Sequence, residues 1–87
     1  MLIANIEPVQ APKGIGTKLG VTIVFYDMKA QNVVIDYFLF NENMSYVDHR
    51  KLEISDPNVL NNWGTDDTII AQAVADIQGY TIISFEP

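Results

Sequence analysis

The residue best suited to acid–base chemistry is the single histidine, His49, which directly follows Asp48. A catalytic imidazole needs a carboxylate within hydrogen-bonding reach and a nucleophile or positioned water beside it. Neighbours in a strand point to opposite faces, so Asp48 and His49 cannot form such a pair with each other. No local signature marks a nucleophile. We therefore assign no catalytic residue, and we expect the chain not to be an enzyme.

Asp66 and Asp67 form the best metal candidate, because hard cations prefer carboxylate oxygens. Calcium loops, however, alternate their acidic ligands and place a glycine and a distal glutamate at set positions, and this pattern is missing. Carboxylates also interact favourably with the free amides and the dipole of a helical first turn. We interpret the pair as part of a helix start and predict no metal and no cofactor.

The segment Gly14-Ile15-Gly16-Thr17-Lys18 could suggest phosphate binding, since glycine-rich loops expose amides to anions. In both familiar nucleotide-binding motifs the loop follows a strand and opens a helix. Here a strand is predicted to follow from Leu19. We interpret the segment as a flexible connection between strands.

Aromatic side chains offer more binding potential than the polar ones, because tyrosine and tryptophan are enriched at protein interfaces. Trp63 lies at the predicted corner between two helices, where it either packs into the core or reaches a neighbouring subunit. The candidate protein interface combines this residue with side chains of two predicted strands: Tyr26, Val34, Phe38, Phe40 and Trp63.

The chain is acidic, with five Lys and Arg against eleven Asp and Glu and a formal charge of −6. Nucleic-acid binding requires a positive face, so we predict no nucleic-acid partner. The longest apolar runs, 23–26 and 37–40, are too short to span a membrane, and the N-terminus has no signal-like segment. The absence of cysteine excludes disulfides and thiol catalysis. With 87 residues, the chain has room for one core, and association would add to its stability.

The first segment, 2–6, is predicted to be an edge strand, because Pro8 and Pro12 donate no hydrogen bond and interrupt a ladder. A loop over 11–18 is expected to follow. Alternation of apolar residues predicts a strand over 19–27, in which the following would share a face: Leu19, Val21, Ile23 and Phe25.

A second alternating strand is predicted over 33–40, with one face formed by Val33, Ile35, Tyr37 and Leu39. Its opposite face is also largely apolar. That face is expected to be covered partly by helices and partly by another subunit. A turn over 41–44 then leads to a polar strand over 46–54, whose charges are typical of a sheet edge.

Asp56 followed by Pro57 predicts the start of a short helix that ends at a left-handed Gly64. Its apolar stripe is Val59, Leu60 and Trp63. Thr65 is predicted to cap a longer helix that ends at Gly79. The apolar face of that helix is predicted to consist of Ile70, Ala73, Val74 and Ile77.

A final strand is predicted over 80–85, from its content of β-branched residues. The whole chain, 1–87, is therefore interpreted as a single α+β domain. We predict a mostly antiparallel β-sheet meander, then a short helix, a longer capped helix and a final strand.

Two segments resemble a group of small, mostly uncharacterised tailed-bacteriophage proteins encoded near virion structural genes. The first is Ile6-Glu7-Pro8-Val9-Gln10-Ala11-Pro12-Lys13-Gly14, and the second is Leu60-Asn61-Asn62-Trp63-Gly64-Thr65-Asp66-Asp67 with the helix that follows. The middle of the chain shares only a pattern of strands with that group. Related sequences tend to have Gly-containing turns where this chain has Asn43.

The resemblance implies a virion component of the capsid or tail, made in the host cytoplasm and used in many copies. Our leading hypothesis is a non-enzymatic bacteriophage structural or accessory protein that binds other virion proteins or copies of itself. We expect a homo-oligomer or a part of a larger assembly. The alternative is a small cytosolic protein-binding module or regulator, and a third possibility is a metal- or ligand-dependent enzyme fragment.

Overall fold

The computed structural model describes residues 1–64 and 66–86 of the chain. Within them, a five-stranded sheet is combined with two helices, which confirms the predicted α+β class. The elements, in chain order, are β1 (Leu2–Ala11), β2 (Gly14–Asp27), β3 (Asn32–Phe40), β4 (Tyr46–Ile54), α1 (Pro57–Trp63), α2 (Asp67–Gln78) and β5 (Ile82–Phe85).

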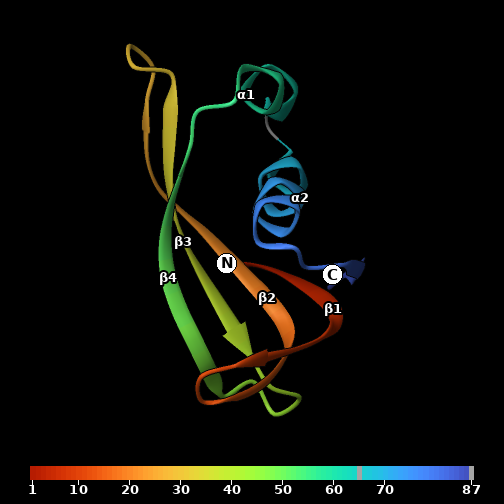
Figure 1. Cartoon of the computed structure of the whole chain (residues 1–87). Helices are drawn as coiled ribbons and strands as arrows, with labels where there is room; N and C mark the ends of the chain where they lie inside the picture. The colour runs from red at the N-terminus through yellow and green to blue at the C-terminus, as the bar shows by residue number, and fades with distance from the viewer. Residues whose placement is uncertain (65, 87) are drawn as a thin grey trace.

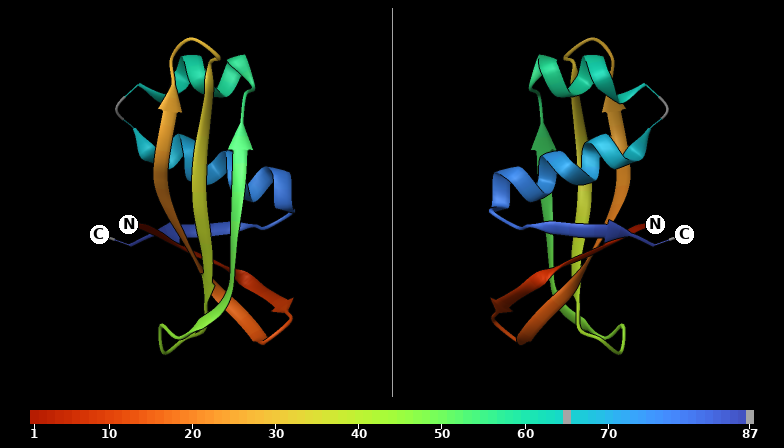
Figure 2. Two further views of the ribbon diagram at one scale, coloured as in Figure 1. Left: turned by 90° about the vertical axis from the view of Figure 1, so that its left-hand side faces the viewer. Right: turned by 90° about the vertical axis from the view of Figure 1, so that its right-hand side faces the viewer.

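The strands lie in the order β4-β3-β2-β1-β5, and every neighbouring pair is antiparallel. Both helices lie on one side of the sheet, and the sheet twists strongly, so that β1 and β5 run across the direction of β3 and β4 (Figures 1 and 2). The polar strand β4 lies at an edge of the sheet, as its charges predict. No helix of the described residues is long and apolar enough to cross a membrane.

Two predictions about the N-terminal part are wrong. β1 is not an edge strand, because β5 pairs with its outer side. It also continues past Pro8. The register with β2 shifts between Asn5 and Val9, so the pairing does not need a backbone N–H from the proline. The predicted loop over 11–18 is instead a tight turn, and β2 begins at Gly14.

The core lies between the sheet and the helices. The four alternate residues of β3 predicted to share a face are all buried there, at 1% exposure or less: Val33, Ile35, Tyr37 and Leu39. They form one cluster with α2 residues, of which Ile70, Ala73 and Val74 are buried as predicted. Ile77, by contrast, is 56% exposed, so its assignment to the core face is wrong. The small residues Ala71 and Ala75 are buried instead, so the buried face of α2 is rotated away from Ile77 and towards these two alanines.

A β-bulge changes the faces of β2. Val24 is the extra residue, because Ile23 pairs with Ile35 whereas Phe25 pairs with Val34. Phe25 therefore lies on the side away from Ile23, and its side chain is 57% exposed. The prediction that Phe25 shares the face of Leu19, Val21 and Ile23 is wrong for this reason.

The start of α1 agrees with its sequence signal. The side chain of Asp56 accepts a hydrogen bond from the backbone N–H of Asn58 at 2.9 Å, and Pro57 is the first helical residue. The helix ends at Gly64 with φ 52° and ψ −116°. Its φ is positive, but this is not the left-handed helical conformation that we predicted.

The ends of α2 are also capped. The predicted cap Thr65 lies outside the described residues. Asp66 accepts a hydrogen bond from the backbone N–H of Thr68 at 3.0 Å, so it is the N-cap in the structure, and Asp67 lies in the first turn. Gly79 ends the helix with φ 80° and ψ 24°, the predicted left-handed conformation.

Candidate functional site

The side of the sheet opposite the helices, which we call the open face, is not covered by any helix of the described residues (Figure 1). Four rings from β3 and β4 gather on it, and we call them the aromatic cluster: Phe38, Phe40, Tyr46 and His49. The rings of Phe38 and His49 are stacked, with their centroids 4.3 Å apart and their planes inclined by 8°. The ring centroids of Phe40 and Tyr46 are 5.1 Å apart. The cluster is therefore a contiguous surface and not a set of isolated side chains.

The register of β3 and β4 positions these rings. Phe38 lies directly opposite His49, and cross-strand neighbours on one face are close enough for ring contact. A register shift near Val47 then brings Tyr46 opposite Phe40. Without this irregularity the alternation would turn Tyr46 away from Phe40.

Gly20 of β2 has no side chain, and this leaves the space that the ring of Phe40 occupies against the sheet. A Cβ atom at Gly20 would lie 2.8 Å from Cε2 of Phe40 and 2.5 Å from Sδ of Met1. Any other residue would therefore displace the ring. Phe40 is 5% exposed although it belongs to the open face, whereas Tyr46 beside it is 67% exposed. The cluster thus has a fixed buried base and an exposed aromatic rim.

Charged groups border the cluster. The carboxylate oxygen Oδ1 of Asp36 lies 3.5 Å from Nε2 of His49 and 3.9 Å from Nζ of Lys51. Oδ1 is buried and has no hydrogen-bond partner among the described residues. Asp48, the sequence neighbour of His49, instead accepts a hydrogen bond from Nε of Arg50 at 3.0 Å. His49 thus stacks on an aromatic ring beside a carboxylate from another strand.

Trp63 lies on the helix side and is partly buried against the core. Its ring meets Tyr26 edge-on at 5.1 Å, and its Nε1–H donates a hydrogen bond to Oδ1 of Asp67 at 3.0 Å. The structure therefore separates the predicted interface residues. Phe38, Phe40 and Val34 belong to the open face, whereas Tyr26 of β2 and Trp63 of α1 pack together on the helix side.

Sequence reasoning missed Tyr46 and His49 as members of this surface. Tyr46 is the first residue of a strand rich in charged residues, and the polar character of that strand does not indicate an aromatic surface. The single histidine suggests acid–base chemistry more readily than ring stacking. The signal that could have found them is the hairpin pairing of β3 with β4, which places each opposite a phenylalanine.

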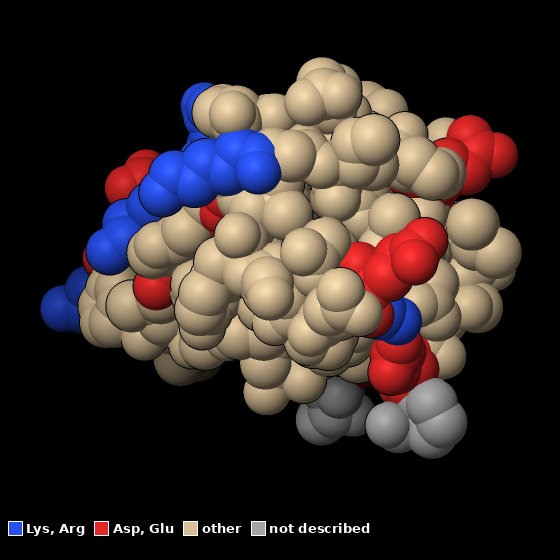
Figure 3. Space-filling view, turned by 90° about the horizontal axis from the view of Figure 1, so that it is seen from below, with Lys and Arg blue, Asp and Glu red and all other residues tan. Residues whose placement is uncertain are grey.

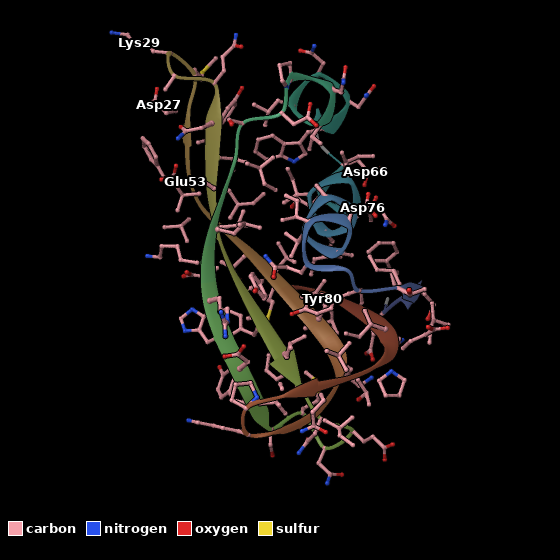
Figure 4. The ribbon with its side chains drawn as sticks, viewed as in Figure 1. Asp27, Lys29, Glu53, Asp66, Asp76 and Tyr80 are labelled. Atoms are coloured by element: carbon pink, nitrogen blue, oxygen red, sulfur yellow. The ribbon has the colours of Figure 1, made fainter. Side chains whose placement is uncertain are left out.

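The acidic side chains do not converge. Asp66 and Asp76 lie along α2, whereas Asp27 lies at the distant tip of the β2–β3 hairpin near Lys29 (Figure 4). Among residues 1–64 and 66–86, no group of three or more His, Asp or Glu side chains is placed to hold a metal ion. The two acids at the start of α2 are occupied by capping and by the hydrogen bond from Trp63.

The glycine-containing segment predicted to be a flexible connection is the first part of β2, so that prediction is wrong. Lys18 forms an ion pair with Glu86 and donates a hydrogen bond to Oδ1 of Asn5 at 2.8 Å. Strand pairing organises this segment, and it does not curl around an anion. Most of the surface seen in Figure 3 is uncharged, and its Lys and Arg side chains lie mainly on one side of that view.

A second polar group lies on the helix side, where Tyr80 approaches the sheet below α2 (Figure 4). The rings of Tyr37 and Tyr80 meet edge-on at 6.4 Å, beside a hollow of about 300 Å³ that Asp48 and Arg50 also line. Burial, together with the neighbouring Tyr80, raises the pKa of Tyr37 from 10.0 to about 12. The neutral phenol is therefore the form that the fold stabilises.

This shift predicts alkaline sensitivity. Below pH 10 Tyr37 is protonated in both states, so its contribution to stability is complete. Between pH 10 and about 12 the unfolded chain loses the proton and the folded one does not, so stability falls by an amount on the order of 2 kcal/mol. Urea denaturation across this range measures the fall. The Tyr37→Phe variant should lack this component, and an identical pH dependence in both proteins would contradict the assignment.

Comparisons of the chain with protein-family models, with curated proteins and with solved structures found no match.

Proposed function

We propose that the chain is a non-enzymatic structural or accessory component of a tailed-bacteriophage particle, and that it assembles with other virion proteins through its open face. The observation that supports this most is the aromatic cluster, which lies on a sheet side without helices in the described residues and ends in exposed rings. Interfaces are enriched in such aromatic anchors.

The packing of the rings in the aromatic cluster favours a role of this surface in binding another protein. Phe40 packs close to Gly20, and Phe38 contacts three rings, those of Phe40, Tyr46 and His49, so little side-chain freedom remains to be lost on association. The exposed ring of Tyr46 then offers apolar area together with a hydroxyl group. Asp36 and Lys51 at the border supply charges of both signs that can orient a partner.

The assignment to a phage particle rests on the resemblance of residues 6–14 and 60–67 to virion-associated proteins. We propose that the chain is located in the capsid or the tail of the particle. The place of synthesis is the host cytoplasm, and the mature location is the virion.

The test is incorporation into particles purified from the host that produces this chain. Mass spectrometry should detect the chain in the particles. The Tyr46→Glu variant should reduce incorporation about tenfold or more, because it places a charge in a desolvated contact. The matched control is Ile77→Glu, which changes a similarly exposed apolar residue on α2, 56% against 67% exposed.

Absence of the chain from particles, combined with a monomeric state at the highest soluble concentration, would overturn the proposal. Equal incorporation of both variants would show that the open face is not the surface that binds other virion proteins. A stable complex with one other protein and no incorporation would instead select the small protein-binding module or regulator.

A further inference from the structure

β2 is longer than the strand that pairs with one of its sides. The pairing with β1 ends where Leu2 meets Val21, whereas the pairing with β3 continues to Asp27. Within the described residues, the stretch 22–27 therefore has a partner strand on one side only. We call its other side the free edge. In Figures 1 and 2 this part of β2 rises beyond the start of β1 and is the outermost strand there.

The free edge presents backbone groups that can accept a further strand, because alternate N–H and C=O groups of an edge strand point away from its one neighbour. Its side chains are apolar and accessible: Val24, Phe25 and Tyr26 are 50%, 57% and 39% exposed. No charged residue occurs from Leu19 to Tyr26. This combination favours pairing with another chain.

The other edges of the sheet are protected in ways that the free edge is not. β4 has charged side chains along its length, including Asp48, Arg50, Lys51 and Glu53. β5 is only four residues long. Charges and shortness are the devices that discourage edge pairing in natural sheets. Along residues 22–27 the single charged residue is Asp27, at the end of the free edge, and the remaining irregularity is the bulge at Val24.

A hollow of about 240 Å³ lies where β1 ends and the free edge begins. It is lined by Met1, Leu2, Val21, Thr22, Ile23 and Asp67. An added strand that continued the line of β1 would begin in this hollow and then run along the free edge. The shape of the edge is therefore compatible with one more antiparallel strand.

We propose that the free edge pairs antiparallel with the same edge of a second copy of this chain, about a two-fold axis perpendicular to the sheet. The reason for a second copy is the self-complementarity of residues 22–27. With the axis between Val24 and Phe25, the single charged residue, Asp27, lies opposite Thr22 of the second copy and not opposite itself. Ile23 then lies opposite Tyr26 of the second copy, a β-branched and aromatic pair that is favourable across strands.

The bulge at Val24 makes this register possible. Directly opposed residues must share a face, and residues three apart in a regular strand do not. Because of the extra residue, Ile23 and Tyr26 both lie on the helix side, opposite Ile35 and Val33 of β3. Thr22 and Asp27 both lie on the open face for the same reason. The ladder between the copies is expected on both sides of the bulge and is interrupted at its centre.

This surface differs from the aromatic cluster, so the inference goes beyond the proposed function and does not require it. The two-fold axis joins the two sheets into one and places both open faces on the same side. Two copies would thus present a double aromatic surface. An edge pair and a face contact together would allow a component to be used in many copies.

The test combines sedimentation equilibrium over a range of concentrations with hydrogen exchange of the backbone amides. We expect a monomer–dimer equilibrium in which amides of the free edge become more protected as concentration rises. Phe25→Lys should raise the dissociation constant about tenfold or more. Val24→Lys is a second variant at the same edge, and circular dichroism verifies that each variant is folded.

The matched control is Ile77→Lys, which makes the same change in net charge at a 56% exposed apolar position near the C-terminal end of α2, away from the free edge. It should leave the dissociation constant unchanged. A wild-type protein that stays monomeric, or a dimer whose free-edge amides remain unprotected, would overturn the inference. A dimer disrupted by Tyr46→Glu but not by the two edge variants would also overturn it, while leaving the proposed function intact.

Discussion

Replacing Ile35 by Ala should lower the free energy of unfolding by about 2 to 5 kcal/mol. Ile35 is completely buried in β3 and belongs to the core cluster that includes Ile70 and Val74 of α2. Truncation removes apolar contacts and leaves a cavity between sheet and helix, which neighbouring backbone elements can close only in part. A loss of this size is a large share of the roughly 5 to 15 kcal/mol that stabilises a typical domain.

Urea denaturation followed by fluorescence of Trp63, the single tryptophan, measures this loss. The matched control is Ile83→Ala, which deletes the same atoms from a side chain that is 65% exposed in β5. It should cost less than about 1 kcal/mol. Similar losses in both variants would contradict the placement of Ile35 at the centre of the core.

Gly20→Val should destabilise the protein by about 1 to 3 kcal/mol, because the added side chain must occupy space that Phe40 fills. The 2.5 Å approach to Met1 is easily relieved, since the thioether is flexible. The 2.8 Å approach to the Phe40 ring is harder to relieve, since that ring is 5% exposed and packs against Tyr46. Substitution should therefore also expose the base of the aromatic cluster.

A double-mutant cycle isolates this contact. Phe40→Ala removes the ring, and in that background Gly20→Val should cost less than it does in the wild-type protein, by about 0.5 to 3 kcal/mol. Urea denaturation of the four proteins gives the coupling energy. Additive effects would show that Phe40 does not lie over Gly20, and the description of a fixed aromatic surface would then fail.

The regular parts of the fold could be predicted because period-two patterns specify faces. Val33, Ile35, Tyr37 and Leu39 alternate without interruption, and all of them are buried as expected. The cap at Asp56 was likewise readable from a local signal. In both places the physical cause lies within a few neighbouring residues.

The errors occur where pairing with a distant segment decides the conformation. The bulge at Val24 turns Phe25 to the other face, and no residue type in β2 marks it. β1 passes through Pro8 because it pairs with β2 before and after the proline, at residues 2–5 and 9–11. Ile77 follows helical periodicity, yet it is exposed, so the intrinsic pattern is overridden by the way α2 packs.

The candidate site was predictable only in part. The apolar second face of β3 indicated Phe38 and Phe40, but the partners Tyr46 and His49 depend on the register of β4. Trp63 and Tyr26 carried the same aromatic signal, and the structure packs them against each other on the helix side. Composition therefore indicated an association surface, and cross-strand register was needed to define its members.

Electron cryomicroscopy of the intact assembly that contains this chain tests the central claim most directly, because it shows what each surface contacts. The account predicts that the exposed rings of the aromatic cluster, Tyr46 above all, are buried against another protein component of the particle. A map in which the chain is present but its open face is solvated in every copy would contradict the account.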